Sequence, residues 1–271
     1  MHHIPVRKME FEIPTADNFD PKWAAGNIHL SYLTIAISLY VAYLEPFLVK
    51  ALRRVLDRVE DPELKECVDR FCRQEAQHYQ QHERFNEAIL GMDYPGLEDR
   101  FTRLKDDFDR FLETKSERWC VGFVEGFEAY INQGALRSLK SGVFEHPQTD
   151  RRFGDLFKWH MTEEIEHRFV AYDIYQHLFG NYLYRVKMCF VAQWHIWKFI
   201  MDCVRIMSPV DTARYDSSYR FSPFMRAFST VMIQPVFFRT YMPWYSPYRM
   251  KVPDIIQDYS KSLSESAKSV S

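Results

Sequence analysis

The sequence holds few of the residues that break regular structure, with 9 glycines and 13 prolines in 271 residues. It contains no recognisable glycine-rich phosphate loop, Rossmann fingerprint or Ser-His-Asp arrangement, so nucleotide-dependent and serine-hydrolase chemistry have no support. An excess of one charge is also absent, because 35 Lys and Arg against 37 Asp and Glu leave a formal net charge of -2. We therefore expect no nucleic-acid partner.

The cysteines are too few and too irregularly spaced for a disulfide framework. The five are Cys67, Cys72, Cys120, Cys189 and Cys203, an odd number with no Cys-x-x-Cys pair. No signal peptide is recognisable at the N-terminus. These features predict a cytoplasmic protein whose cysteines are buried thiols rather than metal ligands.

Long uninterrupted hydrophobic runs are missing as well. Residues 30–44 are strongly apolar, but they are shorter than the roughly 20 residues that a bilayer requires and run into Glu45 and Pro46. A buried core helix is predicted there. Residues 182–206 are long enough but carry several charges, which is typical of an amphipathic helix packed in the core or lying against a lipid surface. Peripheral membrane contact is therefore left open.

The sequence does contain a helical period of apolar residues between a few well-marked breaks. Helices are predicted over residues 28–58, 62–91, 98–115, 117–142, 150–179 and 182–207. No alternating strand pattern extends over more than a few residues. The predicted fold class is therefore all-α.

The two ends of the chain differ from this helical middle. Four segments are expected: an extended N-terminal segment over 1–27, a helical metal-binding domain over 28–207, a C-terminal wrap packed on the same domain over 208–259, and a disordered tail over 260–271. The wrap is rich in aromatic residues and proline, and its aromatic side chains need a surface to cover. The tail is polar and small, which predicts disorder.

The chemistry is concentrated in two copies of a Glu-x-x-His motif on separate predicted helices. Glu75 and His78 lie in "RQEAQHYQQHERFN", and Glu164 and His167 repeat the spacing in "WHMTEEIEH", with His160 one turn earlier. On a helix of 3.6 residues per turn each set projects from one face. A single copy is usually an exposed polar pair. Two copies are what a dinuclear carboxylate site in a four-helix bundle requires, together with a lone Glu from each of two further helices.

Two further predicted helices do carry carboxylates among apolar residues. Glu45 interrupts an apolar helix, where burying a carboxylate is costly unless it is paired or ligating. Glu125 and Glu128 compete for the same role in "CVGFVEGFEAYI". Gly122 and Gly126 allow another backbone to approach closely near Glu125. We therefore predict Glu125 as the ligand and Glu128 as its neighbour or substitute.

With these motifs the chain resembles the bacterial family described as predicted metal-dependent hydrolases, a branch of the ferritin-like superfamily. The matching stretches lie within about residues 6–180 and include "VRKMEFEIP", "YLEPFLVKALRRV", "FVEGFEAYI" and "WHMTEEIEHRFVAYDIY". The C-terminal "FFRTYMPWYSPY" is similar to that family's closing aromatic and proline motif. The resemblance implies a ferritin-like four-helix bundle with additional helices and an aromatic-rich C-terminal extension. Pro46, directly after Glu45, disfavours helical geometry at that residue.

The position of His160 gives a second resemblance. The order His-x-x-x-Glu-x-x-His looks like that of the di-iron arylamine N-oxygenases, in which an additional histidine completes one iron. This implies that His160 is a seventh ligand, and the alternative is a histidine that lies beside the site without ligating. Imidazoles with several carboxylates on a four-helix scaffold indicate two iron ions, with manganese or zinc as alternatives.

Several neighbours of these residues are candidates for supporting roles. His82 either ligates or hydrogen-bonds a ligating carboxylate. Glu163 and Gln74 directly precede the two motif glutamates and are placed to reach a histidine of the facing helix. Asp173 is placed to anchor either the imidazole of His167 or Arg168, with a structural salt bridge as the alternative. Glu166 is predicted to face solvent.

Three functional hypotheses follow. The first is a dinuclear, di-iron carboxylate enzyme that uses dioxygen and an electron donor to oxidise an apolar or aromatic small molecule. The second is a metal-dependent hydrolase that uses a metal-activated water. The third is an iron-binding protein without turnover. No catalytic residue beyond the metal ligands is predicted, and a homodimer is left open.

Overall fold

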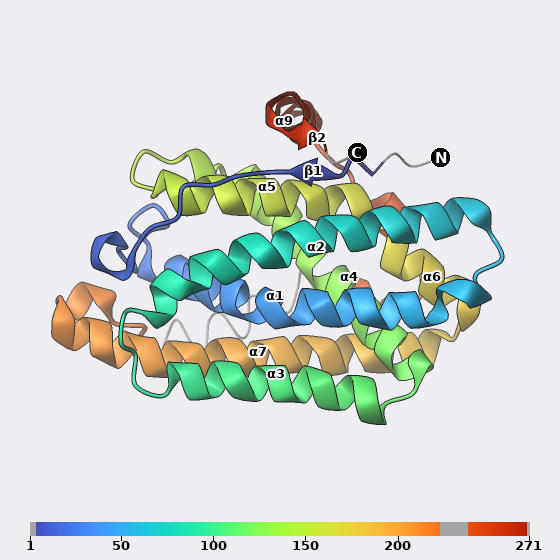
Figure 1. The fold of residues 1–271 in the computed structure, drawn as a ribbon, viewed down its shortest axis with the longest axis horizontal. Helices are drawn as coiled ribbons and strands as arrows, with labels where there is room; N and C mark the ends of the chain where they lie inside the picture. The colour runs from blue at the N-terminus through green and yellow to red at the C-terminus, as the bar shows by residue number, and fades with distance from the viewer. Residues whose placement is uncertain (1–3, 223–237, 270–271) are drawn as a thin grey trace.

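The computed structural model describes residues 4–222 and 238–269, and this part of the chain is almost entirely helical (Figure 1). The α-helices are α1 (Ile28–Val55), α2 (Pro62–Leu90), α3 (Leu97–Thr114), α4 (Glu117–Ser141), α5 (Arg151–His167), α6 (Val170–Leu178), α7 (Tyr182–Arg214) and α9 (Asp254–Ser266). Short 3-10 helices are η1 (Ala16–Asn18), η2 (Leu56–Arg58), η3 (Val143–Glu145), η4 (Ser217–Tyr219), η5 (Phe238–Tyr241) and η6 (Pro247–Arg249). Strand β1 (Arg7–Lys8) pairs antiparallel with β2 (Lys268–Ser269). The predicted all-α class is confirmed, and the arrangement is consistent with a ferritin-like bundle.

Side-chain caps explain where the helices begin. Asn27 accepts hydrogen bonds from the backbone of α1, and Asp61 does the same for α2, which has Pro62 at its first position. Ser116 and Asp150 cap α4 and α5 in the same way. The starts of α1, α2, α3, α4, α5 and α7 therefore agree with the sequence prediction to within one residue.

Two of the predicted helices differ from the structure, and a third keeps its helical geometry at a proline. The expected helix over 150–179 is two helices, since a turn after His167 separates α5 from α6. Helix α7 continues to Arg214 through Pro209 instead of ending near residue 207. Helix α1 runs through Pro46 without a break, so Glu45 keeps its helical position. A proline removes one backbone hydrogen bond from a helix. A buried helix can tolerate this loss because packing against the neighbouring helices stabilises the helix.

Helices α1, α2, α3 and α7 lie side by side along the long axis, while α4 passes behind them and α5 lies above α2 (Figure 1). Helices α4 and α7 approach closely at Gly126, where a Cβ atom would lie only 2.7 Å from the carbonyl oxygen of Met188. The core between the helices is apolar and rich in aromatic side chains. The four helices α1, α2, α4 and α5 surround the buried polar groups described below.

One helix is long and apolar enough to cross a membrane by length and composition. This is Ile28–Arg58, but 72% of its most apolar 18-residue window is buried inside the protein. That burial fits the predicted core helix and a soluble protein. Helix α7 buries one side and exposes Phe190 and Trp194. Peripheral membrane contact and a homodimer stay predictions.

The C-terminal tail is more ordered than its composition suggests. Disorder is predicted over 260–271, yet α9 extends to Ser266 and β2 follows it. Tyr259 and Leu263 pack against the core, and Ser260 and Ser264 bind Arg7. These distant contacts stabilise a segment that composition alone would leave unfolded. Much of the predicted wrap, residues 223–237, lies outside the described residues.

Candidate metal centre

Four helices bring seven ionisable side chains together in the middle of the bundle, all at most 2% exposed. They are Glu45 on α1, Glu75 and His78 on α2, Glu128 on α4, and His160, Glu164 and His167 on α5. Burying so many carboxylates is costly unless cations or hydrogen bonds compensate. The cluster is therefore the most demanding polar feature of the described core.

One group of donors combines two carboxylates with two imidazoles. Glu45, His78, His160 and Glu164 each offer a ligand atom within 4.8 Å of the others. His160 Nε2 lies 2.9 Å from Glu164 Oε1 and 3.4 Å from Glu45 Oε1. This donor set suits a divalent transition metal.

A second group shares Glu164 with the first. Glu75, Glu164 and His167 also place ligand atoms within 4.8 Å of one another. His167 Nε2 lies 3.2 Å from Glu164 Oε2, 3.3 Å from Glu75 Oε1 and 3.6 Å from Glu128 Oε2. The two oxygens of Glu164 thus face different histidines, one in each group.

The structure corrects the choice between the two glutamates of α4. Glu128 faces His167, whereas Glu125 forms a buried ion pair with Arg185 of α7, 3.0 Å from Oε1 to Nη1. The close approach that Gly126 permits is real, but the backbone that approaches is α7. Because that contact lies on the face of Glu125, this carboxylate meets a guanidinium and not the histidine cluster.

The hydrogen-bonding state of these side chains fits a bound cation. Both carboxylate oxygens of Glu45, Glu75 and Glu128 are buried without a hydrogen-bond partner, and so is Nδ1 of His78. Buried polar atoms are nearly always paired, so such a concentration of unpaired acceptors needs an explanation. Metal ions supply one, because each lone pair could be used in coordination.

The electrostatics of the cluster agree with this interpretation. Burial, with repulsion from neighbouring carboxylates, raises the pKa of Glu45 and of Glu128 well above the usual range. Burial also acts to raise the pKa of Glu164, but His167 and His160 outweigh it and hold that pKa below its usual value. Without a cation the site therefore favours protons on Glu45 and Glu128 and a negative charge on Glu164.

His78 is oriented by residues outside the cluster. Its Nε2 lies 3.0 Å from Glu163 Oε2, and its unpaired Nδ1 turns toward Glu75, 3.7 Å away. Glu163 in turn accepts a 2.8 Å hydrogen bond from Arg7 of β1. The predicted role of Glu163 matches this contact, which fixes the imidazole with Nδ1 available to a metal.

His167 is held by a matching contact. Its Nδ1 lies 3.0 Å from Gln74 Oε1, and the Gln74 amide donates to Pro5 O and to Glu166 Oε2. Glu166 accepts hydrogen bonds from Arg7 as well. The prediction that Glu166 faces solvent does not hold, since its side chain is only 11% exposed. Glu166 instead accepts hydrogen bonds from Arg7 and Gln74, the residues that lead to His78 and His167.

His82 lies behind His160 and away from the carboxylates. Its Nε2 is 2.6 Å from His160 Nδ1, and its Nδ1 is 2.8 Å from Ser38 Oγ, which donates to Asn86. With both ring nitrogens engaged, His82 fits the supporting role and not the ligating one. Burial and the neighbouring His160 lower its pKa well below the usual range, so the ring is neutral.

Asp173 lies apart from the histidine cluster. It accepts a hydrogen bond from Tyr248 of η6, while the Nδ1 of His167 is already bonded to Gln74. The anchoring role predicted for Asp173 is therefore taken by Gln74.

Comparison with known proteins agrees with this site. Residues 5–251 match the family described as predicted metal-dependent hydrolase. The chain belongs to this family. No curated protein and no solved structure gives a significant match. The description of this metal-dependent hydrolase family indicates an enzyme that needs a metal, and it corresponds to the second of the three functional hypotheses.

Some residues that support this candidate site were not identified from the sequence. Arg7 lies within the motif "VRKMEFEIP", but nothing local links it to Glu163, which is 156 residues away. Asn86 lies one turn after His82 on α2, and packing of α1 against α2 brings Ser38 to both of them. A polar residue inside an apolar helix stretch, as Ser38 is, was the available signal.

Proposed function

We propose that this chain is an enzyme whose reaction depends on two metal ions held between α1, α2, α4 and α5. The observation that supports this most is the shared carboxylate, because the two oxygens of Glu164 belong to two adjoining donor groups. A carboxylate in that position is suited to bridging two ions.

In this proposal each ion has its own ligands. Glu45, His78 and His160 would hold the first ion, Glu75, Glu128 and His167 the second, and Glu164 would bridge them. Four carboxylates carry four negative charges when ionised, and two divalent ions would balance them. The neutral imidazoles then add no further charge.

The family description favours hydrolysis as the reaction class. When bound, such ions acidify a water for hydrolysis or, if they are iron, activate dioxygen for oxidation. The protein's own part is to fix the ligands, since Glu163 and Gln74 orient His78 and His167. The apolar packing around the centre excludes bulk water. An apolar or aromatic small molecule is the substrate class that suits such surroundings.

Oxidation of a small molecule by dioxygen is the second candidate. The observation that favours it is the third imidazole, His160, in a buried set that otherwise consists of carboxylates and two histidines. This donor set suits iron as well as zinc or manganese. An electron donor would then be required as a partner. An iron-binding protein without turnover is the weakest candidate.

Metal analysis and activity measurements test these proposals together. Protein purified without oxygen should contain close to two ions per chain; one ion or none would contradict the dinuclear centre. Turnover of ester, amide or phosphate substrates without oxygen, using zinc or manganese, would support hydrolysis. Turnover that needs iron, oxygen and a reductant would support oxidation and overturn the hydrolase proposal.

A further inference from the structure

A basic pocket lies between the C-terminal segment and the end of α4. Its volume is about 640 Å³, and Lys140, Arg239, Arg249 and Lys251 line it together with Trp244 and Tyr245. None of the residues that line this pocket is acidic. Within the described ranges none of the four cations forms an ion pair. Positive charge in the basic pocket is therefore not balanced by the protein itself.

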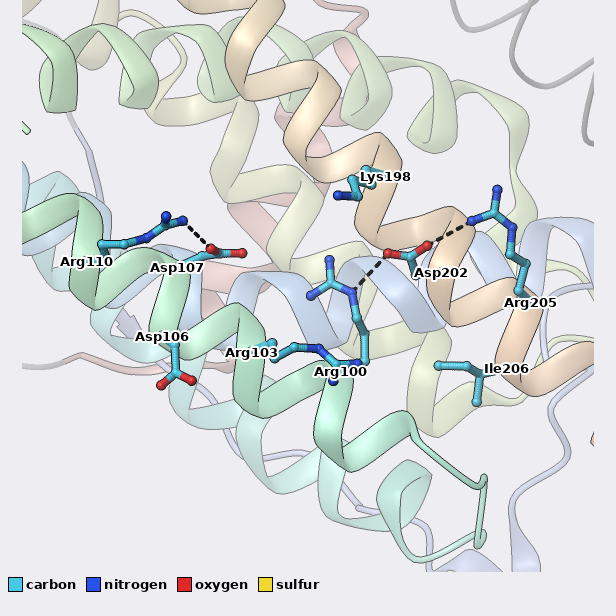
Figure 2. A pocket seen from close by; sticks show the side chains of 9 residues that line it. All are labelled: Arg100, Arg103, Asp106, Asp107, Arg110, Lys198, Asp202, Arg205 and Ile206. Atoms are coloured by element: carbon cyan, nitrogen blue, oxygen red, sulfur yellow. Dashed lines mark hydrogen bonds and ion pairs between the residues drawn. The ribbon is translucent and has the colours of Figure 1, made fainter.

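The pocket between α3 and α7 has a different arrangement, in which ion pairs form among the lining residues (Figure 2). There Arg110 pairs with Asp107 at 2.5 Å, and Asp202 binds both Arg100 and Arg205 at 3.1 Å and 2.9 Å. These pairs engage three of the five cations that line the pocket, so an outside anion would have to compete with carboxylates there. The basic pocket has no such competitor among its lining residues.

The basic pocket also offers an apolar surface. Trp244 is 64% exposed, an unusual setting for an indole in a soluble protein. Arg249 donates a 3.2 Å hydrogen bond to the carbonyl oxygen of Trp244, which holds the guanidinium beside that residue. A pocket lined by both arginine and aromatic side chains suits a ligand that has an oxyanion at one end and an apolar body.

The inner wall of the basic pocket lies close to the proposed metal centre. Tyr245 is only 8% exposed and packs against Cys189 and Ala129. Ala129 directly follows Glu128 in α4. Burial, with the charge of Glu125 first among the neighbours and that of Glu128 contributing, raises the pKa of Tyr245 well above its usual range, so the inner wall of the basic pocket lies within electrostatic reach of Glu128.

We propose that the basic pocket binds the carboxylate or phosphate end of an organic anion with an apolar body, and that such anions are the substrates of this enzyme. The assignment as substrate rests on the proposed function, whereas anion binding does not. Four unpaired cations at the mouth and Trp244 beside them would select an anionic substrate over a neutral one.

Calorimetric titration of the full-length protein, both metal-loaded and metal-free, tests the proposal. The probes are octanoate, phenylacetate and phenyl phosphate, with uncharged phenylacetamide as the matched control. At least one anion should bind with a dissociation constant below about 1 mM, and phenylacetamide should bind at least about tenfold more weakly than phenylacetate. Arg249→Ala and Lys251→Ala should each weaken anion binding about tenfold. Arg103→Ala, in the pocket between α3 and α7, should leave anion binding in the basic pocket unchanged.

Several outcomes would overturn the proposal. They are equal binding of phenylacetate and phenylacetamide, an equal loss in the Arg103→Ala variant, no anion bound below about 1 mM, and binding to anionic lipid vesicles without binding of the free anions. Anion binding with two ions present but turnover confined to neutral substrates would overturn the substrate assignment alone. If the protein binds anions but takes up no metal when metal is supplied, the basic pocket is confirmed as an anion site and the proposed function is contradicted.

Discussion

Glu164 is the single side chain that joins the two donor groups, since Oε1 lies 2.9 Å from His160 and Oε2 lies 3.2 Å from His167. Glu164→Gln keeps the size of the side chain but removes its charge. We expect loss of both ions, measured by elemental analysis of purified protein. Asp155→Asn on the exposed side of α5 is the matched control and should keep both ions. Two tightly bound ions in Glu164→Gln would contradict the shared ligand.

The two glutamates of α4 should respond differently to the same substitution. Glu128→Gln should reduce metal content, because Glu128 faces His167. Glu125→Gln should retain the metal but lower the free energy of unfolding by about 3 to 5 kcal/mol, because it leaves Arg185 buried without its carboxylate. Metal analysis and urea denaturation measure the two effects. Metal loss in Glu125→Gln with unchanged metal in Glu128→Gln would reverse the assignment.

At the scale of elements, strand β1 and helix α9 meet beside Glu163 and Glu166 of α5, behind the metal centre. Arg7 of β1 binds Glu163 and Glu166, and Ser264 of α9 accepts a 3.0 Å hydrogen bond from it. Arg7→Ala should weaken metal affinity about ten- to hundredfold, as loss of an outer support of a ligating histidine does. Competition with a chelator measures the affinity. Ser264→Ala should have a smaller effect, and an unchanged affinity in Arg7→Ala would show that Arg7 only stabilises the fold.

The contact between α4 and α7 depends on Gly126. A Cβ atom there would lie 2.7 Å from the carbonyl oxygen of Met188, so Gly126→Ala must push the helices apart. We expect it to lower the free energy of unfolding by about 1 to 3 kcal/mol. Gly134→Ala, on the same helix with nothing within 4 Å of the new atom, should raise it by about 0.5 to 1 kcal/mol. Urea denaturation of both variants compares the two, and a destabilised Gly134→Ala variant would count against this explanation.

At the scale of the whole molecule, metal removal should make stability depend on pH. Burial raises the pKa of Glu45 and Glu128, and hydrogen bonds to Glu163 and Glu75 outweigh burial to raise that of His78. A folded pKa above the unfolded value contributes stability at low pH that is lost as pH rises through the folded pKa. Burial lowers the pKa of His82 and of His160, so these two groups make stability rise with pH. Their effect is confined to pH values below about 7.

The metal-free protein should therefore lose stability as the pH rises above about 7, by at most about 1.4 kcal/mol per pH unit for each linked group. Metal binding needs these groups deprotonated, so affinity should rise over the same range. Urea denaturation with and without a chelator at several pH values measures both effects. A gap in stability between the two forms that narrows as pH rises would contradict the proton linkage.

Local sequence determined the helices and the faces on which the motifs lie. The spacing of Glu75 with His78 and of Glu164 with His167 sets their common direction, because the helical repeat follows from backbone sterics and short-range hydrogen bonds. Caps such as Asn27 and Asp61 determined where helices begin for the same reason. The all-α fold, the two motifs and the lone carboxylate Glu45 could therefore be predicted.

Only the tertiary structure decided which buried groups meet. Glu125 and Glu128 are both buried on α4, and the choice between them depends on where Arg185 of α7 and His167 of α5 come to lie. Arg7 reaches Glu163 across 156 residues of chain, which no local pattern records. Such pairings depend on how helices pack against one another, and packing is a property of the whole set of side chains at each contact.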